Sequence, residues 1–258
     1  MKVLLHGCNG KMGQVMTKVI AGTEDMEVVC GVDASPDKAK NAYPVYASLS
    51  SVKESPDIVI DFSHRSSLDG LLAFGLSRNV PLVICTTGFG ADDKQKMSAA
   101  AKRIPILNSP NMSLGVNLLL SLVAQAAQAL SHEFDIEIVE RHHNQKVDSP
   151  SGTAEIIADT INAALGGGME YAYGRHSKSD KRRKTEIGIH AVRGGAIVGD
   201  HDVIFAGQGE VIEIKHSALS RDVFAYGALR AARFLVDKGA GLYSMKDVVE
   251  VSRKARRE

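Results

Sequence analysis

The stretch KVLLHGCNGKMG, residues 2–13, decides the fold of this chain. It begins with a short apolar run typical of a buried strand and continues into an amphipathic stretch that ends at Ala21. Between the two, Gly7, Gly10 and Gly13 are spaced G-x-x-G-x-x-G. Such a turn lets backbone N–H groups approach a pyrophosphate at the helix N-terminus, where the helix dipole favours negative charge. The stretch indicates a dinucleotide-binding loop, and a purely structural glycine turn is the alternative.

The spacing differs from the usual G-x-G-x-x-G, because Asn9 stands where the second glycine would be. Asn adopts left-handed backbone geometry more readily than most residues, so we expect the turn to form. Asp33 ends the next apolar run, twenty residues after Gly13. A carboxylate at that place accepts hydrogen bonds from ribose hydroxyls, which favours dinucleotide binding over a structural turn.

The strand and helix pattern of the first loop repeats through residues 1–111. Besides 2–6, apolar runs that predict strands lie at 27–33, 57–63, 81–87 and 104–110. Amphipathic stretches that predict helices lie at 12–21, 66–77 and 92–102. Buried strands that alternate with helices form a parallel sheet covered on both faces. We therefore predict an α/β fold with a Rossmann-type parallel sheet in a dinucleotide-binding domain over 1–111.

The pattern changes after residue 111. Helices are predicted over 114–130 and 153–165, and strands over 134–141, 186–193, 201–207 and 210–218. These elements predict a second, α+β domain over 112–221 with an open mixed sheet. Residues 222–258 are expected to return to the first domain as helices, beginning with 224–238. The basic run KSDKRRK at 178–184 is expected to lie in a solvated loop, with phosphate binding as the alternative.

Composition excludes several classes of function. The 258 residues carry a net charge of only +1, which gives no sign of nucleic-acid or membrane-surface binding. No apolar run has the ~18 residues of a membrane span, and the run at the start is too short for a leader. Three cysteines lie far apart and form no C-x-x-C, so we expect buried thiols and no metal site. These features predict a soluble, cytoplasmic protein.

The loop ERHHNQKVDSPSGTAE, residues 140–155, concentrates ionisable side chains. Adjacent His142 and His143 on a strand point to opposite faces, so they are poorly placed to share a metal ion. Lys146 suits a Schiff base, a proton donor or an anion clamp. The turn at 149–154 predicts a helix start whose N–H groups, with Ser151, Gly152 and Thr153, bind a carboxylate. An ordinary capped helix is the alternative.

Two more loops end strands of the first domain, CTTGF at 85–89 and NSPNMS at 108–113. Their small residues let the backbone reach a nicotinamide ribose and ring, and plain βα turns are equally compatible with them. The candidate cofactor-binding residues are Gly7, Cys8, Asn9, Gly10, Lys11, Met12, Gly13, Asp33, Phe62, Cys85, Thr86, Thr87, Ser109, Pro110, Asn111 and Met112.

The loop also carries a family resemblance. ERHHNQKVDSPSGTA resembles the signature of the dihydrodipicolinate reductase family, E-x-H-H-x-x-K-x-D-x-P-S-G-T-A, with Ser149 in place of the usual alanine. GCNGKMG, DFS, TTGF, SPNMSLGVN and SRDVFAYGALRAARFL resemble further family motifs in the same order, so the resemblance spans nearly the whole chain. It implies reduction of 4-hydroxy-tetrahydrodipicolinate, a cyclic imine with two carboxylates, by NADH or NADPH in the diaminopimelate route to lysine. It also implies a homotetramer formed through the second-domain sheets.

By the same resemblance, His142 matches the acid and Lys146 a second proton donor. His143, Lys146, Gly152 and Thr153 match the substrate-binding set. Arg221 is a further candidate for substrate contact, with a helix cap or an interdomain salt bridge as the alternative. Other two-domain NAD(P)-dependent dehydrogenases of amino-acid metabolism, and a catalytically silent nucleotide sensor, remain alternatives at this stage.

The residues around Asp33 bear on the choice of nicotinamide cofactor. Asp33 favours the 2′-hydroxyl of NADH and repels a 2′-phosphate. Lys11, Lys38 and Lys40 act in the opposite direction, because their charges attract that phosphate. We expect both cofactors to be used, with NADH equal or better.

Overall fold

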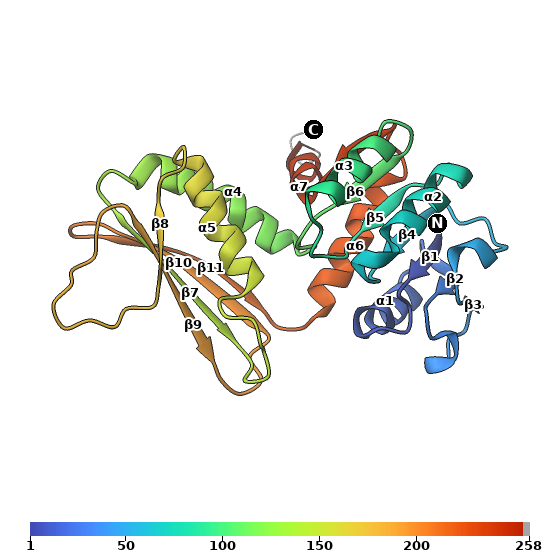
Figure 1. Ribbon diagram of the computed structural model, residues 1–258, viewed down its shortest axis with the longest axis horizontal. Helices are drawn as coiled ribbons and strands as arrows, with labels where there is room; N and C mark the ends of the chain where they lie inside the picture. The colour runs from blue at the N-terminus through green and yellow to red at the C-terminus, as the bar shows by residue number, and fades with distance from the viewer. Residues whose placement is uncertain (255–258) are drawn as a thin grey trace. The chain divides into compact units, whose positions relative to one another are not determined.

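The computed structural model describes residues 1–254 and divides the chain into two compact units (Figure 1). The first unit contains Met1–Leu114 and the chain from Arg221 onward, and the second is Gly115–Ser220. The sequence placed these divisions after residues 111 and 221. Within the described residues, no helix combines the length and the apolar content needed to cross a bilayer.

The first unit is built on a seven-stranded sheet in the order β12-β6-β5-β4-β1-β2-β3, in which all neighbours are parallel. Its strands are β1 (Lys2–His6), β2 (Glu27–Val32), β3 (Val45–Tyr46), β4 (Ile58–Asp61), β5 (Leu82–Ile84), β6 (Pro105–Asn108) and β12 (Gly241–Tyr243). The predicted Rossmann-type sheet is confirmed. The sequence missed β3 and β12, because two or three residues at a sheet edge carry too little pattern to be recognised.

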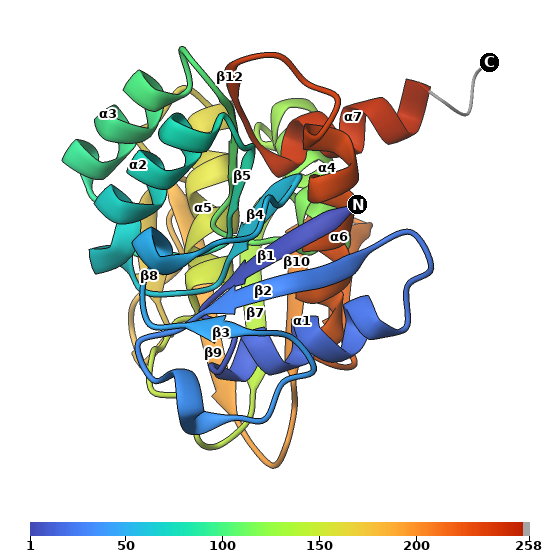
Figure 2. The same cartoon turned by 90° about the vertical axis from the view of Figure 1, so that its right-hand side faces the viewer.

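Helices cover both faces of this sheet. They are α1 (Lys11–Ala21), α2 (Leu68–Arg78), α3 (Ala91–Ala100), α6 (Asp222–Leu235) and α7 (Met245–Lys254), with short 3-10 turns at Pro36–Lys38, Leu49–Ser51 and Arg65–Ser67. Figure 2 shows α2 and α3 on one side of the sheet and α1 and α6 on the other. The sequence predicted α6 as the returning helix and gave no bounds for α7.

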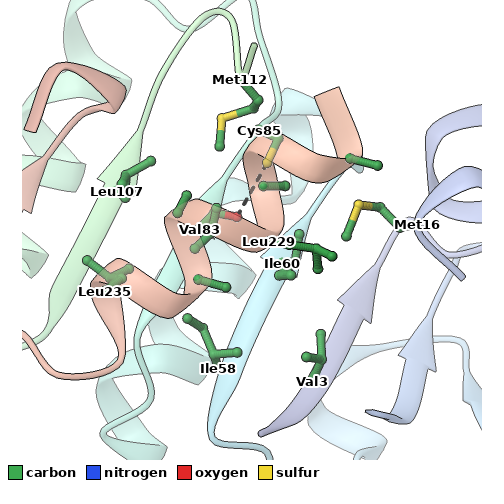
Figure 3. Packing of buried hydrophobic residues seen from close by; sticks show 14 of the residues in the cluster. Val3, Met16, Ile58, Ile60, Val83, Cys85, Leu107, Met112, Leu229 and Leu235 are labelled. Atoms are coloured by element: carbon green, nitrogen blue, oxygen red, sulfur yellow. Dashed lines mark hydrogen bonds between the residues drawn. The ribbon is translucent and has the colours of Figure 1, made fainter. Parts of the chain in front are cut away.

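The strands are apolar on both faces because each face packs against helices. Leu4, Val59 and Ile106 face α2 and α3, and Val3 and Ile60 face α1 and α6. Figure 3 shows α6 crossing the second of these layers. Fully burying an aliphatic side chain contributes roughly 1.5–3 kcal/mol, so this two-sided core holds the strand ends in fixed positions.

The second unit has a five-stranded sheet in the order β11-β10-β7-β9-β8. Its strands are β7 (Asp135–His142), β8 (Glu170–Tyr173), β9 (Glu186–Arg193), β10 (Gly199–Ala206) and β11 (Val211–Ala218). β10 is antiparallel to β7 and β11, whereas β9 is parallel to β7 and β8, which confirms the predicted mixed sheet. The sequence placed only a polar stretch where β8 lies. This short edge strand is exposed or half-buried throughout, so it lacks the apolar run used to recognise strands.

Helices α4 (Leu114–Leu130) and α5 (Gly152–Ala164) pack on one face of this sheet (Figure 1). Burial alternates along β7, so that Ile136, Ile138, Glu140 and His142 share the helix-covered face. The first two lie in the apolar core of the unit, and the last two continue the same row as buried ionisable groups. The strand therefore carries its polar residues from the core to its carboxyl end, beside the loop that leads to α5.

Candidate active site

The glycine loop forms a cavity in the first unit. It follows β1, which lies between β2 and β4 in the sheet, and the cavity of about 340 Å³ opens at the carboxyl ends of these strands. Its lining consists of His6, Gly7, Gly10, Asp33, Ala34, Phe62, Ser63, His64, Ser66 and Ser67. Crevices of this kind, at the point where strand order reverses, bind the pyrophosphate of dinucleotides.

Two glycines are required by close approach. Gly7 has a φ of 78°, and a Cβ there would lie 2.6 Å from the carbonyl oxygen of Phe62. A Cβ at Gly13 would lie 2.2 Å from the carbonyl oxygen of Gly7. The loop is thus packed directly against the chain after β4 and against α1. Gly10, the N-cap of α1, lines the cavity, as a pyrophosphate cradle requires.

The turn forms with Asn9 at the place of the second glycine, as expected, but Asn9 does not have left-handed geometry and contributes through its side chain. Among residues 1–254, the non-glycine residue with positive φ is Asn79 alone. The buried Asn9 carboxamide donates to the carbonyl oxygens of Ser35 (2.7 Å) and Pro36 (3.0 Å) and accepts from Asn41 Nδ2 (2.8 Å). It ties the glycine loop to the chain after β2.

Asp33 occupies the predicted place on this cavity. Its Oδ2 accepts from the Asn9 N–H (3.0 Å) and its Oδ1 from the Ser35 N–H (2.9 Å). Each carboxylate oxygen has a second lone pair, so Asp33 retains the capacity to accept ribose hydroxyls. A larger cavity of about 750 Å³ shares the lining residues His6 and Ala34 and extends along α2, with room for further parts of a nucleotide.

The structure divides the other predicted cofactor-binding residues into two groups. The side chains of Cys8, Cys85 and Met112 lie in the apolar core. Burial raises the pKa of the Cys8 thiol to about 11. These three residues therefore offer a cofactor only their backbone. In contrast, Thr86 Oγ1 is buried with no hydrogen-bond partner in the described part of the chain, which suits a ligand at the end of β5.

The remaining residues of this set lie near strand ends or at the helix start. Lys11, Thr87 and Pro110 are exposed, and Met12 and Asn111 are half-buried. The Ser109 hydroxyl donates to the carbonyl oxygen of Asn111 (2.9 Å), closing the turn after β6. None of these contacts tests cofactor binding, and their roles stay predictions.

In the second unit, the carboxyl end of β7 holds a buried ionic cluster. Glu140 is fully buried, and His142 Nδ1 lies 2.6 Å from its Oε2. Arg193 of β9 donates to both Glu140 oxygens at 2.8 Å, and the Ser151 N–H donates to Oε1 at 2.9 Å. Burial alone would raise the pKa of Glu140, but these donors, with Arg193 first, outweigh it and hold that pKa below its ordinary value. Glu140 is therefore ionised at neutral pH.

The loop after His142 holds a carboxylate between a cation and a helix start. Lys146 Nζ lies 2.8 Å from Asp148 Oδ1, and α5 begins at Gly152, a few residues further along the chain. The Lys146 hydrogen bond and, less strongly, Gly152 lower the pKa of Asp148. Lys146 and Gly152, two predicted substrate-binding residues, thus flank one anion in the sequence.

The other predicted substrate-binding residues are differently placed. Ser151 is buried, where its hydroxyl accepts from the Ala154 N–H as the N-cap of α5 and lies 3.0 Å from His201 Nε2. His143 directly follows β7, and Thr153 lies in the first turn of α5; both are half-buried. Arg221 belongs to the first unit, exposed before α6, and its side chain makes no helix-capping hydrogen bond.

The sequence did not single out Glu140, Arg193, His201 or Asp148, which shape this site. Arg193 and His201 come from β9 and β10, where a strand pattern does not reveal which neighbours meet in space. His201 lies edge-on to His142, with ring centroids 5.3 Å apart, and burial, followed by the charge of His142, lowers its pKa to about 4. Asp148 was visible within the quoted signature but was given no role. Over residues 1–254, no three His, Cys, Asp or Glu side chains gather as a metal site would require.

A Rossmann-type sheet with a glycine cradle, joined to a separate unit with a buried histidine and a carboxylate-binding loop, defines a two-domain nucleotide-dependent oxidoreductase. The family model "Dihydrodipicolinate reductase, N-terminus" matches residues 1–112, and "Dihydrodipicolinate reductase, C-terminus" matches residues 115–249. The chain belongs to the dihydrodipicolinate reductase family, as its signature implied, and is a reductase that uses a pyridine nucleotide.

Individual relatives agree over their full lengths. The chain is 53% identical to a 4-hydroxy-tetrahydrodipicolinate reductase of Caldanaerobacter subterraneus subsp. tengcongensis, covering 96% of this chain and 98% of that one. It is 50% identical to the protein of the same name from Clostridium tetani, covering 95% of each. Among solved structures, a dipicolinate-bound dihydrodipicolinate reductase from Paenisporosarcina sp. TG-14 superposes with a TM-score of 0.80 at 26% identity, covering 95% of this chain and 97% of that chain.

Proposed function

We propose that this chain reduces 4-hydroxy-tetrahydrodipicolinate to tetrahydrodipicolinate in the diaminopimelate route to lysine. The observation that carries the proposal is the anion site, where Lys146 Nζ binds the carboxylate of Asp148 close in the sequence to the start of α5 at Gly152. A dicarboxylate substrate presents the same chemical group to Lys146. The Paenisporosarcina relative binds dipicolinate, a small dicarboxylate, which supports this assignment.

The reaction needs a hydride donor and a proton donor, and each unit supplies one. The pyridine nucleotide, when bound, supplies the hydride. In the first unit, the N-terminus of α1 binds the pyrophosphate of the nucleotide, and Asp33 accepts hydrogen bonds from its ribose. The unpartnered Thr86 hydroxyl, near the end of β5, forms a hydrogen bond to the nucleotide. The remaining predicted residues of the three strand-end loops complete this site through their backbone.

The second unit binds the substrate and moves the proton. Lys146, Gly152 and Thr153 hold one carboxylate, and His143 makes a supporting contact. Arg221, which belongs to the first unit, makes a further supporting contact with the substrate. His142 donates the proton to the substrate as the hydride arrives, and Lys146 is the second donor. The hydrogen bond between His142 Nδ1 and Glu140 holds the ring in one orientation, which suits a general acid.

Replacing His142 by Gln tests this assignment. Turnover should fall roughly 10²–10⁴-fold, the range for loss of a general acid, while NADH affinity stays unchanged. The assay follows NADH consumption with freshly generated 4-hydroxy-tetrahydrodipicolinate, with homoserine as the comparison substrate. Consumption with homoserine alone would indicate another dehydrogenase, and NADH binding without consumption would indicate a sensor. Near-normal turnover of the variant would remove His142 from the acid role.

The choice of cofactor is part of the proposal. Asp33 is held in place by two N–H donors at the cavity edge, which supports recognition of the NADH ribose. Lys11, Lys38 and Lys40 are exposed, so solvent screens their attraction for a 2′-phosphate. Both cofactors should be used, with NADH equal or better in kcat/KM at fixed ionic strength. A preference for NADPH above roughly tenfold, or about 1.4 kcal/mol, would contradict this reading of Asp33.

We further propose a cytoplasmic homotetramer assembled through the second-unit sheets. Support comes from the sheet face that α4 and α5 leave uncovered, where charged side chains are paired with one another, as in Arg141 with Asp202 and Arg175 with Glu137. Val192 and Val211 are exposed by 44% and 58% on the same face. Sedimentation equilibrium would show a tetramer, and a monomer at micromolar concentration would exclude it.

A further inference from the structure

The two ring nitrogens of His142 have different surroundings. Nδ1 lies 2.6 Å from Glu140 Oε2. An ionised carboxylate can only accept hydrogen bonds, so Nδ1 must carry a hydrogen in both the neutral and the protonated ring. Nε2 is then the nitrogen that gains or loses a proton.

Glu140 is built to remain a carboxylate in one orientation. Its Oε1 accepts from Arg193 Nη2 and the Ser151 N–H, and its Oε2 accepts from Arg193 Nη1 and His142 Nδ1. Four donors thus fill the four lone-pair positions of a group with no exposed surface. Neither a proton nor a rotated carboxylate fits this arrangement without breaking a buried hydrogen bond.

A side chain at position 199 would crowd the Nε2 side of the ring. A Cβ at Gly199 of β10 would lie 2.9 Å from His142 Nε2. This is the distance of a hydrogen-bond partner, so any side chain at 199 would occupy the place where a proton acceptor meets Nε2. The φ of Gly199 is not positive, so close approach, and not backbone conformation, is the reason for glycine here.

We propose that Nε2 is the atom of His142 that delivers the proton, and that Glu140, Arg193 and Gly199 are positioning residues that enforce this choice. In the transfer, the Nε2–H bond breaks and its electron pair stays on Nε2. The proton bonds to the substrate atom that gains electron density from the hydride, and the neutral ring keeps its Nδ1 hydrogen on Glu140. The inference rests on the proposed role of His142 as the acid.

The charged and titratable groups around the ring agree with this assignment. Glu140 faces it from β7, Arg193 backs Glu140 from β9, and His201 lies against it from β10. Since burial lowers the pKa of His201 to about 4, His201 is neutral near pH 7 and does not repel a protonated His142. Its Nε2 is already bonded to Ser151.

The first test uses Glu140→Gln and Gly199→Ala. Glu140→Gln should lower kcat roughly 10- to 100-fold, the scale known for the hydrogen-bond partners of metal-binding histidines. The KM for NADH should change little, because Glu140 orients the His142 ring and does not line the nucleotide cavity. Gly199→Ala should likewise lower kcat with little change in the KM for NADH. An unchanged kcat in Glu140→Gln would overturn the proposal.

A matched control lies on the same strand. Glu137, on the opposite face of β7, contacts His190 Nε2 at 2.7 Å. Glu137→Gln removes a carboxylate–histidine pair of the same kind and should leave kcat close to the parent value. An equal fall in kcat in this variant would mean that kcat does not report on the positioning of His142.

The second test measures the ring in the parent protein and uses His142→Gln only to assign its resonances. The protein has nine histidines, so the spectrum of ¹⁵N-labelled protein contains resonances from all of them. The resonances that are missing from the spectrum of His142→Gln belong to His142. The neutral ring should carry its hydrogen on Nδ1, and the opposite tautomer would overturn the proposal. If His142→Gln retained turnover, the acid role would fall while the tautomer measurement still described the Glu140 pair, so the two failures are distinguishable.

Discussion

His201 should make the protein less stable as the pH falls from 6.5 to 4.5, and His201→Gln should reduce this loss. Burial, followed by the charge of His142, lowers its pKa from 6.5 to about 4. The unfolded chain therefore binds a proton in this interval that the folded chain does not. A group of this kind destabilises the fold as pH falls through the unfolded value. Over these two pH units the loss is about 2–3 kcal/mol, since one pKa unit corresponds to about 1.36 kcal/mol.

The interval from pH 6.5 to 4.5 separates the effect of His201 on stability from the effects of the carboxylates. Glu140 and Glu137 have lowered pKa values, so their contributions are complete above pH 4.5 and are lost only below it. Burial also lowers the pKa of His216, which leaves a residual slope in the variant.

The measurement is urea unfolding followed by circular dichroism at pH 6.5, 5.5 and 4.5, because the chain has no tryptophan to report by fluorescence. Protein concentration is held fixed, since assembly would otherwise shift the apparent stability. Gln can keep the hydrogen bond to the Ser151 hydroxyl, so the variant should fold. If it loses as much stability between pH 6.5 and 4.5 as the parent, His201 is not a buried neutral histidine.

Three further substitutions test the two sites. Gly13→Ala should weaken NADH binding, measured by calorimetry, roughly five- to 150-fold, because overpacking against Gly7 costs about 1–3 kcal/mol and the loop shifts to relieve it. Gly22→Ala is the control and should bind NADH normally, because its Cβ would lie 3.7 Å from the nearest atom. Lys146→Met should raise the KM for substrate by roughly 10- to 150-fold, since a charged hydrogen bond is worth about 1.5–3 kcal/mol, and an unchanged KM would place the anion site elsewhere. Asp148→Asn should lower that KM by up to about fivefold, because the exposed carboxylate no longer competes for Lys146, and a raised KM would show that Asp148 orders the loop instead.

The first unit could be predicted from sequence because its strands are apolar on both faces and its glycines are fixed by contact. The runs at 2–6 and 57–63 stand out as continuous apolar segments, and their counterparts are buried, β1 from Val3 onward and β4 throughout. Asp33 was found through its distance from the glycine loop. The same reasoning predicted that the turn tolerates Asn9 but did not find the role of its side chain, because tolerance of an unusual backbone does not reveal that a side chain binds another loop.

In the second unit, the signature identified the residues of one loop but not those that hold it. His142 and Lys146 lie close together in the sequence, whereas Arg193 reaches Glu140 across 53 positions. Such a contact depends on which strands are adjacent and in which register, here β7 parallel to β9 with His142 beside Arg193. Apolar periodicity specifies that strands exist but contains little information about this pairing.

The register of β7 explains why the candidate acid is buried so close to an apolar core. Ile136, Ile138, Glu140 and His142 point the same way, so the packing that anchors the first two against α4 and α5 also fixes the last two. A buried carboxylate is costly unless its hydrogen-bonding capacity is filled, and removing a partner leaves a buried charge uncompensated. Arg193 and the start of α5 fill it here. Because the loss of any one donor to Glu140 is so unfavourable, the cluster has one stable arrangement. That arrangement fixes the orientation of the His142 ring through its hydrogen bond to Glu140.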